Sequence, residues 1–366
     1  MEESSKKIKI LYTIPNFDTA GSGKVLYDLA KGLDKSLFEV HIACKNNKGN
    51  FFAEVEKLGL PIHFMDTTTP VRPYFSLWSR LKPFQNFIKK NQFDIVHSWH
   101  WSSDWTEVLT AKLAGSKFVY TKKAMTWGNI HWKIRSFLSS FIVTINEEMS
   151  HYFPYKQNQK LIPLGLDTNY YSPDLFVKKN TDTFFKIITV ANLVPVKGIE
   201  VLIKAIHLLD NTKIRLEILG DTRDNYANNL KKLVIDLKLT NQIFFLGKHI
   251  DVRPFLANSD LYVIPTLNEG RKEGMPMALV EAMSMGIPVL GSNISGINYV
   301  LKDFPELLFE ASNEKALAQK INLYVEKTRD ELERDGNELR AYCLQYFIEE
   351  KFIKEHEELY IKISKK

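Results

Sequence analysis

The sequence has few cysteines and no long apolar run. Its two cysteines, Cys44 and Cys343, lie far apart and without partners at the spacing of a zinc site. This excludes a disulfide framework and favours reduced thiols in a cytoplasmic protein. The first residues, M-E-E-S-S-K-K, contain no apolar core of a signal peptide, and no apolar run approaches 18 residues. We therefore expect neither a secretory signal nor a transmembrane helix.

Acidic residues are also missing from one long stretch, between Thr67 and Phe93. The stretch instead alternates aromatic and aliphatic residues with five cations: Arg72, Arg80, Lys82, Lys89 and Lys90. A basic, aromatic-rich segment can make peripheral contact with an anionic membrane. The alternative is an amphipathic helix packed on the core, its charged heads in water. No recognised motif for nucleic acid accompanies the cations, so we expect no nucleic-acid partner.

Length and patterning indicate two α/β domains. The chain has 366 residues, 45% hydrophobic and 25% charged, as in globular proteins of two domains. Short apolar, β-branched runs alternate with amphipathic segments such as Val25–Leu33, Ile199–Leu209 and Asn229–Leu237. The runs are Ile8–Ile14, Phe38–Cys44, Ile62–Met65, Phe93–Trp99, Lys117–Thr121, Phe141–Ile145, Phe185–Leu193, Ile214–Leu219, Ile243–Leu246, Leu261–Pro265 and Pro288–Gly291.

Continuous apolar strands between helices predict parallel sheets covered on both faces. We expect two doubly wound, Rossmann-like domains, residues 1–168 and 169–345, and a helix at 346–366 that braces one against the other. Ligands of such sheets bind at the carboxyl ends of the strands, so we expect the active site in a cleft between the domains.

The segment E-G-M-P-M-A-L-V-E holds two carboxylates, Glu273 and Glu281, around a predicted helix start. Pro276 suits the first position of that helix, which places Glu281 in its second turn and Glu273 in the loop before it. The amides and dipole of a helix N-terminus attract a phosphate. The pair therefore suits a nucleotide-sugar, with an ordinary loop Glu and a solvated helical Glu as the alternative.

Two further loops follow predicted strands. Lys197, before Gly198 and a helix, would place an ammonium where a diphosphate needs a counter-charge, although a solvated loop lysine fits as well. Gly21 and Gly23 lie in D-T-A-G-S-G-K-V after the first strand and would let backbone amides approach a phosphate or an acceptor. A simple tight turn is the equal alternative.

Four motifs occur in an order that resembles glycosyltransferase family 4, which has the two-domain GT-B fold. They are Ile162–Asp167, Lys197-Gly198, Asp251–Asp260 and the Glu273/Glu281 pair. The resemblance implies a retaining transferase that needs no metal or other cofactor and uses a nucleotide-diphospho-sugar, with UDP the commonest nucleotide. It also implies a glycan or lipid-linked glycan acceptor, in cell-surface polysaccharide synthesis at the inner face of a membrane.

The resemblance also implies residue roles. Lys197 would neutralise the donor diphosphate, Glu281 would bind the ribose, and Glu273 would hold hydroxyls of the sugar. The donor would also contact the backbone around three residues of the predicted turn: Gly274, Met275 and Pro276. Asn192 stands where the family usually has an arginine, a cation that Arg271 or Lys272 could replace.

The segment D-I-V-H-S-W-H-W leaves a predicted strand at its carboxyl end. By resemblance His100 would lie near the transferred sugar, whereas His97 would pack at the strand end with a backbone partner. Trp101 and Trp105 would line the acceptor site, since tryptophan faces stack on sugars; Trp99 fits the core.

Two other functions remain open at this point: a nucleotide-sugar epimerase on the same fold, and a non-catalytic binding protein that has kept the donor site.

Overall fold

The computed structural model describes residues 6–18, 20–49, 51–125, 127–177, 183–270 and 274–365. Three of the residues discussed above, Arg271, Lys272 and Glu273, lie outside the described residues. The chain divides into two compact units. Unit 1 comprises Met1–Gly165 and Glu349–Lys366, and unit 2 comprises Leu166–Ile348.

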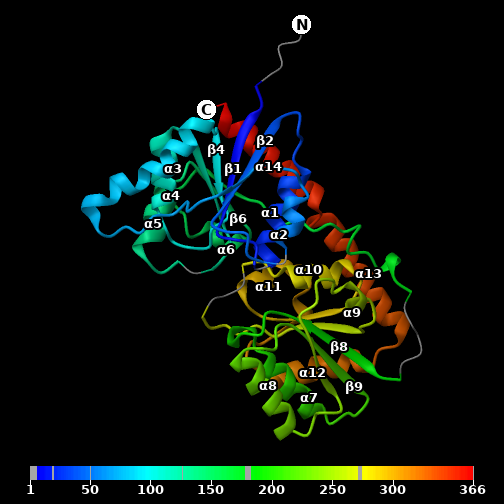
Figure 1. The fold of residues 1–366 in the computed structure, drawn as a ribbon. Coiled ribbons are helices and arrows are strands. Elements are labelled where there is room, and N and C mark those ends of the chain that lie inside the picture. The colour runs from blue at the N-terminus through cyan, green and yellow to red at the C-terminus, as the bar shows by residue number, and fades with distance from the viewer. Residues whose placement is uncertain are drawn as a thin grey trace. The chain divides into compact units, whose positions relative to one another are not determined.

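Unit 1 contains a parallel sheet with the strand order β3-β2-β1-β4-β5-β6-β7 (Figure 1). Its strands are β1 (Ile8–Ile14), β2 (Phe38–Cys44), β3 (Ile62–Phe64), β4 (Ile95–Ser98), β5 (Lys117–Lys122), β6 (Phe141–Thr144) and β7 (Gln159–Leu161). Its helices are α1 (Ala20–Gly32), α2 (Phe52–Glu56), the 3₁₀ turn η1 (Tyr74–Ser76), α3 (Leu77–Asn91), α4 (Thr106–Ala114), α5 (Ile130–Leu138), α6 (Glu147–Ser150) and α14 (Glu349–Ser364).

The connections of unit 1 run in two directions along the sheet. From β1 the chain moves through α1 and α2 to β3, and then returns through α3, α4 and α5 toward β6. Because such crossovers are right-handed, the two sets of helices cover opposite faces. Helix α14 packs on α1 and β1, and α3 to α5 lie next to one another (Figure 1). The inner strands are buried on both sides, which is why they are continuously apolar.

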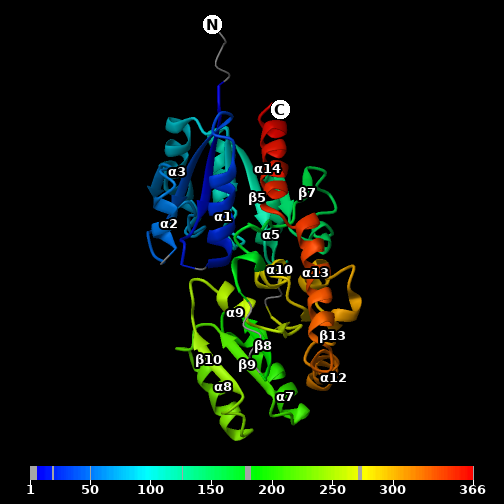
Figure 2. The ribbon, with the colours of Figure 1, turned by 90° about the vertical axis from the view of Figure 1, so that its right-hand side faces the viewer.

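Unit 2 contains a second parallel sheet, with the order β10-β9-β8-β11-β12-β13 (Figure 2). Its strands are β8 (Phe185–Val190), β9 (Ile214–Leu219), β10 (Ile243–Gly247), β11 (Leu261–Ile264), β12 (Val289–Ser292) and β13 (Leu308–Phe309). Its helices are η2 (Pro173–Leu175), η3 (Pro195–Lys197), α7 (Ile199–Leu209), α8 (Asn225–Asp236), α9 (Arg253–Ala257), α10 (Met277–Ser284), α11 (Ser295–Val300), η4 (Pro305–Leu307), α12 (Glu314–Val325) and α13 (Arg329–Tyr346).

The predicted fold class, two doubly wound parallel-sheet domains followed by helices, is confirmed. Each of the predicted strands is present, three of them with the predicted bounds: β1, β2 and β9. The predicted domain limits and the bracing role of residues 346–366 stay predictions. None of the helices within the described ranges combines the length and the apolar character that a bilayer span requires.

Candidate functional site

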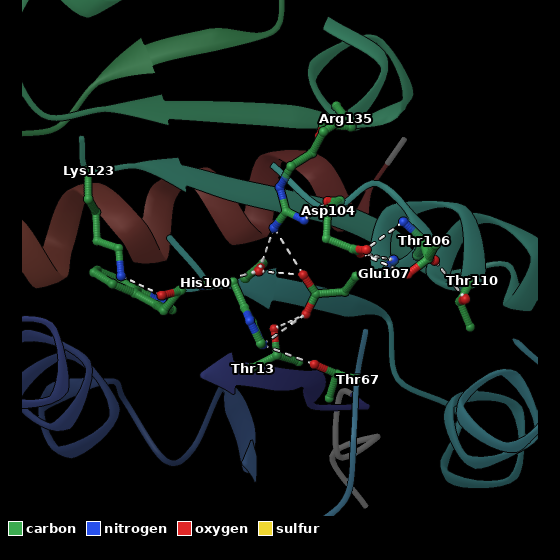
Figure 3. A network of polar contacts seen from close by, with 12 residues as sticks. Thr13, Thr67, His100, Asp104, Thr106, Glu107, Thr110, Lys123 and Arg135 are labelled. Atoms are coloured by element: carbon green, nitrogen blue, oxygen red, sulfur yellow. Dashed lines mark hydrogen bonds and ion pairs between the residues drawn. The ribbon is translucent and has the colours of Figure 1, made fainter. Parts of the chain in front are cut away.

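A network of buried polar side chains lies at the carboxyl edge of the unit 1 sheet (Figure 3). Strands β1 and β4 are neighbours, with Thr13 in register with Ser98, so both side chains reach this edge. Glu107, in the first turn of α4, is fully buried beneath them. Its carboxylate accepts a hydrogen bond from Ser98 Oγ at 2.6 Å and another from the Thr13 hydroxyl.

Arg135 of α5 supplies the counter-charge to this carboxylate. Its Nη2 donates to Glu107 Oε2 at 2.9 Å and to Ser98 Oγ at 2.7 Å, and neither charged side chain is exposed to solvent. Burial alone would raise the pKa of Glu107, but His100, Arg135 and the hydrogen bonds from Ser98 and Thr13 together hold it below its ordinary value. Glu107 is therefore an ionised carboxylate inside the domain.

His100 lies beside this ion pair and is itself buried, with 8% of its surface exposed. Its Nε2 is 3.0 Å from the Thr67 hydroxyl and 3.7 Å from Glu107 Oε1. Burial lowers the pKa of His100, Glu107 opposes the shift, and Arg135 adds to it. The ring is thus neutral at neutral pH, and the nearby carboxylate favours the proton on Nε2. Its Nδ1, left as an acceptor, has no hydrogen-bond partner among the residues described.

The predicted acceptor tryptophans lie on the connection from β4 to α4. Trp101 is half-buried, with Lys123 Nζ 5.4 Å from its ring centroid, and the same ammonium donates to the carbonyl oxygen of Trp99. Trp105 is half-buried, and its Nε1 donates to His131 Nδ1 at 3.0 Å. Trp99 is fully buried, as expected of a core residue.

His97 is buried at the end of β4, as predicted, but the predicted backbone partner is wrong. Its Nδ1 is 2.6 Å from the Tyr360 hydroxyl of α14, and its Nε2 is 2.7 Å from the Thr121 hydroxyl. Both partners are side chains, because the backbone groups at this depth belong to the sheet ladder. His97 joins the sheet to α14 rather than facing the site.

The glycines expected in a loop after β1 instead lie within a helix. Gly21 and Gly23 belong to the first turn of α1, where backbone N–H groups have no intrahelical acceptor. A Cβ on Gly23 would lie 3.1 Å from the Phe17 ring, whereas a Cβ on Gly21 would meet nothing within 4 Å. Close packing therefore accounts for Gly23, whereas no described neighbour crowds Gly21.

In unit 2, Lys197 ends the short helix η3 that follows β8. Gly198 comes next, with φ 62°, and a Cβ there would lie 2.2 Å from the carbonyl oxygen of Pro265. The amide of Leu267 donates to the carbonyl oxygen of Val196 at 2.8 Å. The turn that carries Lys197 is therefore fixed against the segment that leaves β11, at the carboxyl edge of the sheet.

The segment after β11 leads to α10. Gly274, Met275 and Pro276 are buried ahead of it. Pro276 was predicted as the first helical residue, but its ψ of 103° is extended, and it forms the N-cap while α10 begins at Met277. Glu281 lies in the second turn, as predicted, and is half-buried.

Tyr171 and Tyr262 flank Glu281. Burial first and the Glu281 carboxylate second raise the pKa of both phenols. Neither tyrosine could be predicted as a neighbour of Glu281, because both are far from it in the sequence. Asn192, which stands in place of the expected arginine, is exposed on the turn after β8.

A cavity of about 390 Å³ opens in unit 2 at the carboxyl ends of β11, β12 and β13. Its polar lining comes from Asn268, Asn293 and Glu310, and its apolar lining includes Leu308 and Phe309. The sequence did not indicate this cavity, since its lining comes from three separate connections.

Two family models match the chain. The model described as "Glycosyltransferase Family 4" matches residues 19–169, and the model described as "Glycosyl transferases group 1" matches residues 173–342. The two matches together cover most of both units.

Named relatives come from bacteria. WcaL of Escherichia coli (strain K12), named for colanic acid biosynthesis, is 26% identical to this chain. The match covers 60% of this chain and 61% of WcaL. The capsular polysaccharide biosynthesis glycosyltransferase CapH of Staphylococcus aureus is 23% identical over 83% of this chain and 86% of CapH.

Solved structures share the fold. A glycosyltransferase from Rickettsia africae is 20% identical and superimposes with a TM-score of 0.86 over 98% of this chain and 99% of its own. HepE of Anabaena, solved in complex with UDP and glucose, is 18% identical with a TM-score of 0.80 over 96% and 98%. The fold of this chain is therefore the GT-B fold.

Proposed function

The chain belongs to glycosyltransferase family 4, and on that premise we propose that it transfers a sugar from a nucleotide-diphospho-sugar to a glycan or lipid-linked glycan acceptor. We further propose that this transfer belongs to cell-surface polysaccharide synthesis, which the names of WcaL and CapH support. The two free cysteines, both buried, support a cytoplasmic location.

One observation carries the donor assignment: the Lys197 turn is fixed against the segment leading from β11 to α10. The ammonium of Lys197 would neutralise the diphosphate at this edge, with the first-turn amides of α10 as further donors. Glu281 would bind the ribose hydroxyls, with Tyr171 orienting its carboxylate. The donor would contact the backbone of three residues: Gly274, Met275 and Pro276. Glu273, outside the described residues, would hold the sugar.

UDP is the proposed nucleotide. HepE, which has the same fold, has been solved with UDP and with UDP-glucose. The cavity beside Asn293 and Glu310 offers amide and carboxylate groups with which part of a donor could form hydrogen bonds. Calorimetry with UDP, GDP and ADP tests the choice, and a preference for another nucleotide would refute it.

In unit 1, we assign His100 to the reacting sugar and Trp101 and Trp105 to the acceptor. A neutral imidazole, oriented by Thr67 and Glu107, can accept a hydrogen bond at Nδ1 without adding charge. Gly21 would let the amides of α1 approach the leaving phosphate or the acceptor.

We propose a retaining, metal-independent transfer. An acceptor hydroxyl oxygen bonds to the anomeric carbon as the bond from that carbon to the diphosphate breaks on the same face, and the hydroxyl proton passes to the leaving diphosphate. The protein then acts by positioning and by stabilising the departing charge. Proton NMR of the product tests retention, and an inverted anomer would refute it. Loss of turnover in EDTA would refute metal independence.

Nucleotide release tests the function as a whole. The wild-type protein should release UDP from one UDP-sugar of a panel, in the presence of a lipid-linked or soluble acceptor. Glu281→Gln should weaken UDP binding measured by calorimetry, because the ribose loses a charged acceptor. Glu333→Gln, at an exposed position of α13, is the matched control. Equal UDP affinities in the two variants would contradict the role of Glu281.

A second candidate is a non-catalytic binding protein, which Asn192 favours because one expected cation for the diphosphate is missing. This candidate predicts that UDP-sugars bind with no release of UDP by any acceptor tested. Release of UDP that is lost in Lys197→Ala would exclude it.

A further inference from the structure

The outer surface of neighbouring helices in unit 1 carries cations and exposed rings without exposed carboxylates. We define the α3–α5 surface as the solvent side of residues 70–76, which include η1, and of α3, α4 and α5. The sequence from Thr67 to Asn146 contains three acidic residues, and each is engaged inside the domain. Glu107 is buried, Asp104 accepts from the Thr106 amide at 2.9 Å, and Asp94 accepts from the Lys9 amide at 2.8 Å.

The cations of the α3–α5 surface point to solvent. They are exposed, and within the described part of the chain they form no ion pairs: Arg72, Lys82, Lys89, Lys90, Lys112 and Lys133. A surface with six unpaired cations and no compensating acid has a positive potential that attracts a negatively charged partner.

Large apolar side chains project from the same surface. Phe75 of η1 is 90% exposed, Trp78 at the start of α3 is 61% exposed, and Phe137 of α5 is 80% exposed. The turn before α3 is held in place by Arg80, which donates to the carbonyl oxygens of Pro70 and Pro73. Phe75 and Trp78 therefore project from an ordered segment, and apolar rings gathered on one exposed surface mark an interaction site.

We propose that the α3–α5 surface docks on an anionic lipid bilayer. The lysines would meet the headgroups, and Phe75, Trp78 and Phe137 would enter the interface, where aromatic rings are favoured. A nucleic acid would satisfy the cations but offers no apolar phase for Phe75 and Phe137, so the rings favour lipid. Attachment of this kind needs no membrane-spanning helix.

The test is sedimentation of the full-length protein with vesicles of phosphatidylcholine alone or with added phosphatidylglycerol. We expect binding to the anionic vesicles only, weakened by salt because the attraction is screened. The double variant Lys89→Gln/Lys90→Gln should weaken it about 30-fold, since each lysine near an anionic surface contributes roughly fivefold. Lys204→Gln/Lys232→Gln, which removes two exposed lysines of unit 2, should leave binding unchanged.

The rings are tested separately. Phe75→Ser/Trp78→Ser should weaken binding to the same vesicles about tenfold, because two partly inserted rings are lost. Equal binding to neutral vesicles, or equal losses in the two lysine pairs, would overturn the proposal. Salt-sensitive binding to RNA with none to vesicles would also overturn it and assign the surface to nucleic acid. Vesicle binding requires no donor, so UDP affinity measured on the same variants reports the proposed function independently.

Discussion

The buried pair Glu107–Arg135 allows a test of the unit 1 site that needs no substrate. We consider Glu107→Gln, Arg135→Met and the double variant. In Glu107→Gln the Arg135 guanidinium loses its counter-charge. The new side-chain amide also directs an N–H toward one of the groups that donate to Glu107 in the wild type. In Arg135→Met the carboxylate keeps its bonds from Thr13 and Ser98 but loses the only cation that touches it among the described residues.

The expected magnitudes follow from burial. Both side chains have no exposed surface, so each single variant leaves an uncompensated charge in the interior, at a cost of about 3–5 kcal/mol in unfolding free energy. The double variant buries no charge. It should therefore cost no more than either single variant, so the two residues are coupled by about 3 kcal/mol or more.

Urea unfolding followed by tryptophan fluorescence measures this cycle. All six tryptophans, from Trp78 to Trp132, belong to unit 1, so the signal reports that unit. Glu54→Gln, which breaks the exposed pair with Lys57, is the control and should leave the midpoint unchanged. Single-variant costs below about 1 kcal/mol, or a double variant equal to the sum of the singles, would refute the buried pair.

Three further predictions test other parts of the chain. Gly198→Ala should abolish UDP binding in calorimetry, because its Cβ would meet the Pro265 carbonyl oxygen at 2.2 Å. Gly247→Ala is the control: its φ is 80° and the space around it is open, so it should cost only about 1–2 kcal/mol in unfolding free energy. Burial lowers the pKa of four unit 1 histidines: His63, His97, His100 and His356. Because the unfolded chain then binds more protons, unit 1 should lose stability as pH falls below about 6.5. His356, whose pKa is lowered to about 4, should account for about 3 kcal/mol of that loss, and a flat urea midpoint down to pH 4 would contradict it. Asn192→Arg should tighten UDP binding by about 1.5–3 kcal/mol through a charge-assisted bond to the diphosphate, and unchanged affinity would place Asn192 outside the donor site.

The strands could be predicted because parallel strands buried on both faces are continuously apolar. Phe141–Thr144, with the sequence F-I-V-T, is buried throughout and lies within the predicted run for this reason. The missed strands lack that signal: β7 has the sequence Q-K-L at a sheet edge, and β13 contains only two residues. Helix α1 begins at Ala20, before the predicted start at Val25. The prediction started too late because Gly21 and Gly23 suggest a turn, whereas the first turn of a helix also accepts glycine.

The candidate site was only partly predictable. His100 follows β4 closely and Lys197 lies in the connection after β8, so their place at a carboxyl edge follows from the parallel arrangement. Glu107 could not be identified, because a glutamate in the first turn of a helix is common on surfaces and nothing local marks its burial. Arg135 comes from the next helix along the chain, and only the folded sheet brings its guanidinium to Glu107.

The distribution of charge limits how the proposed reaction can be catalysed. In unit 1 the carboxylate of Glu107 is compensated by Arg135 and His100 is neutral, so this buried cluster offers hydrogen bonds but no net positive charge. We therefore expect negative charge that develops on a leaving diphosphate to be stabilised mainly by unit 2, with the amides of α1 as the contribution of unit 1 proposed above. There Asn192 contributes no charge, which increases the dependence on Lys197. The loss of Lys197 should thus cost about 2–4 kcal/mol in kcat/KM, whereas exchanges around His100 should alter sugar selectivity more than the departure of the nucleotide.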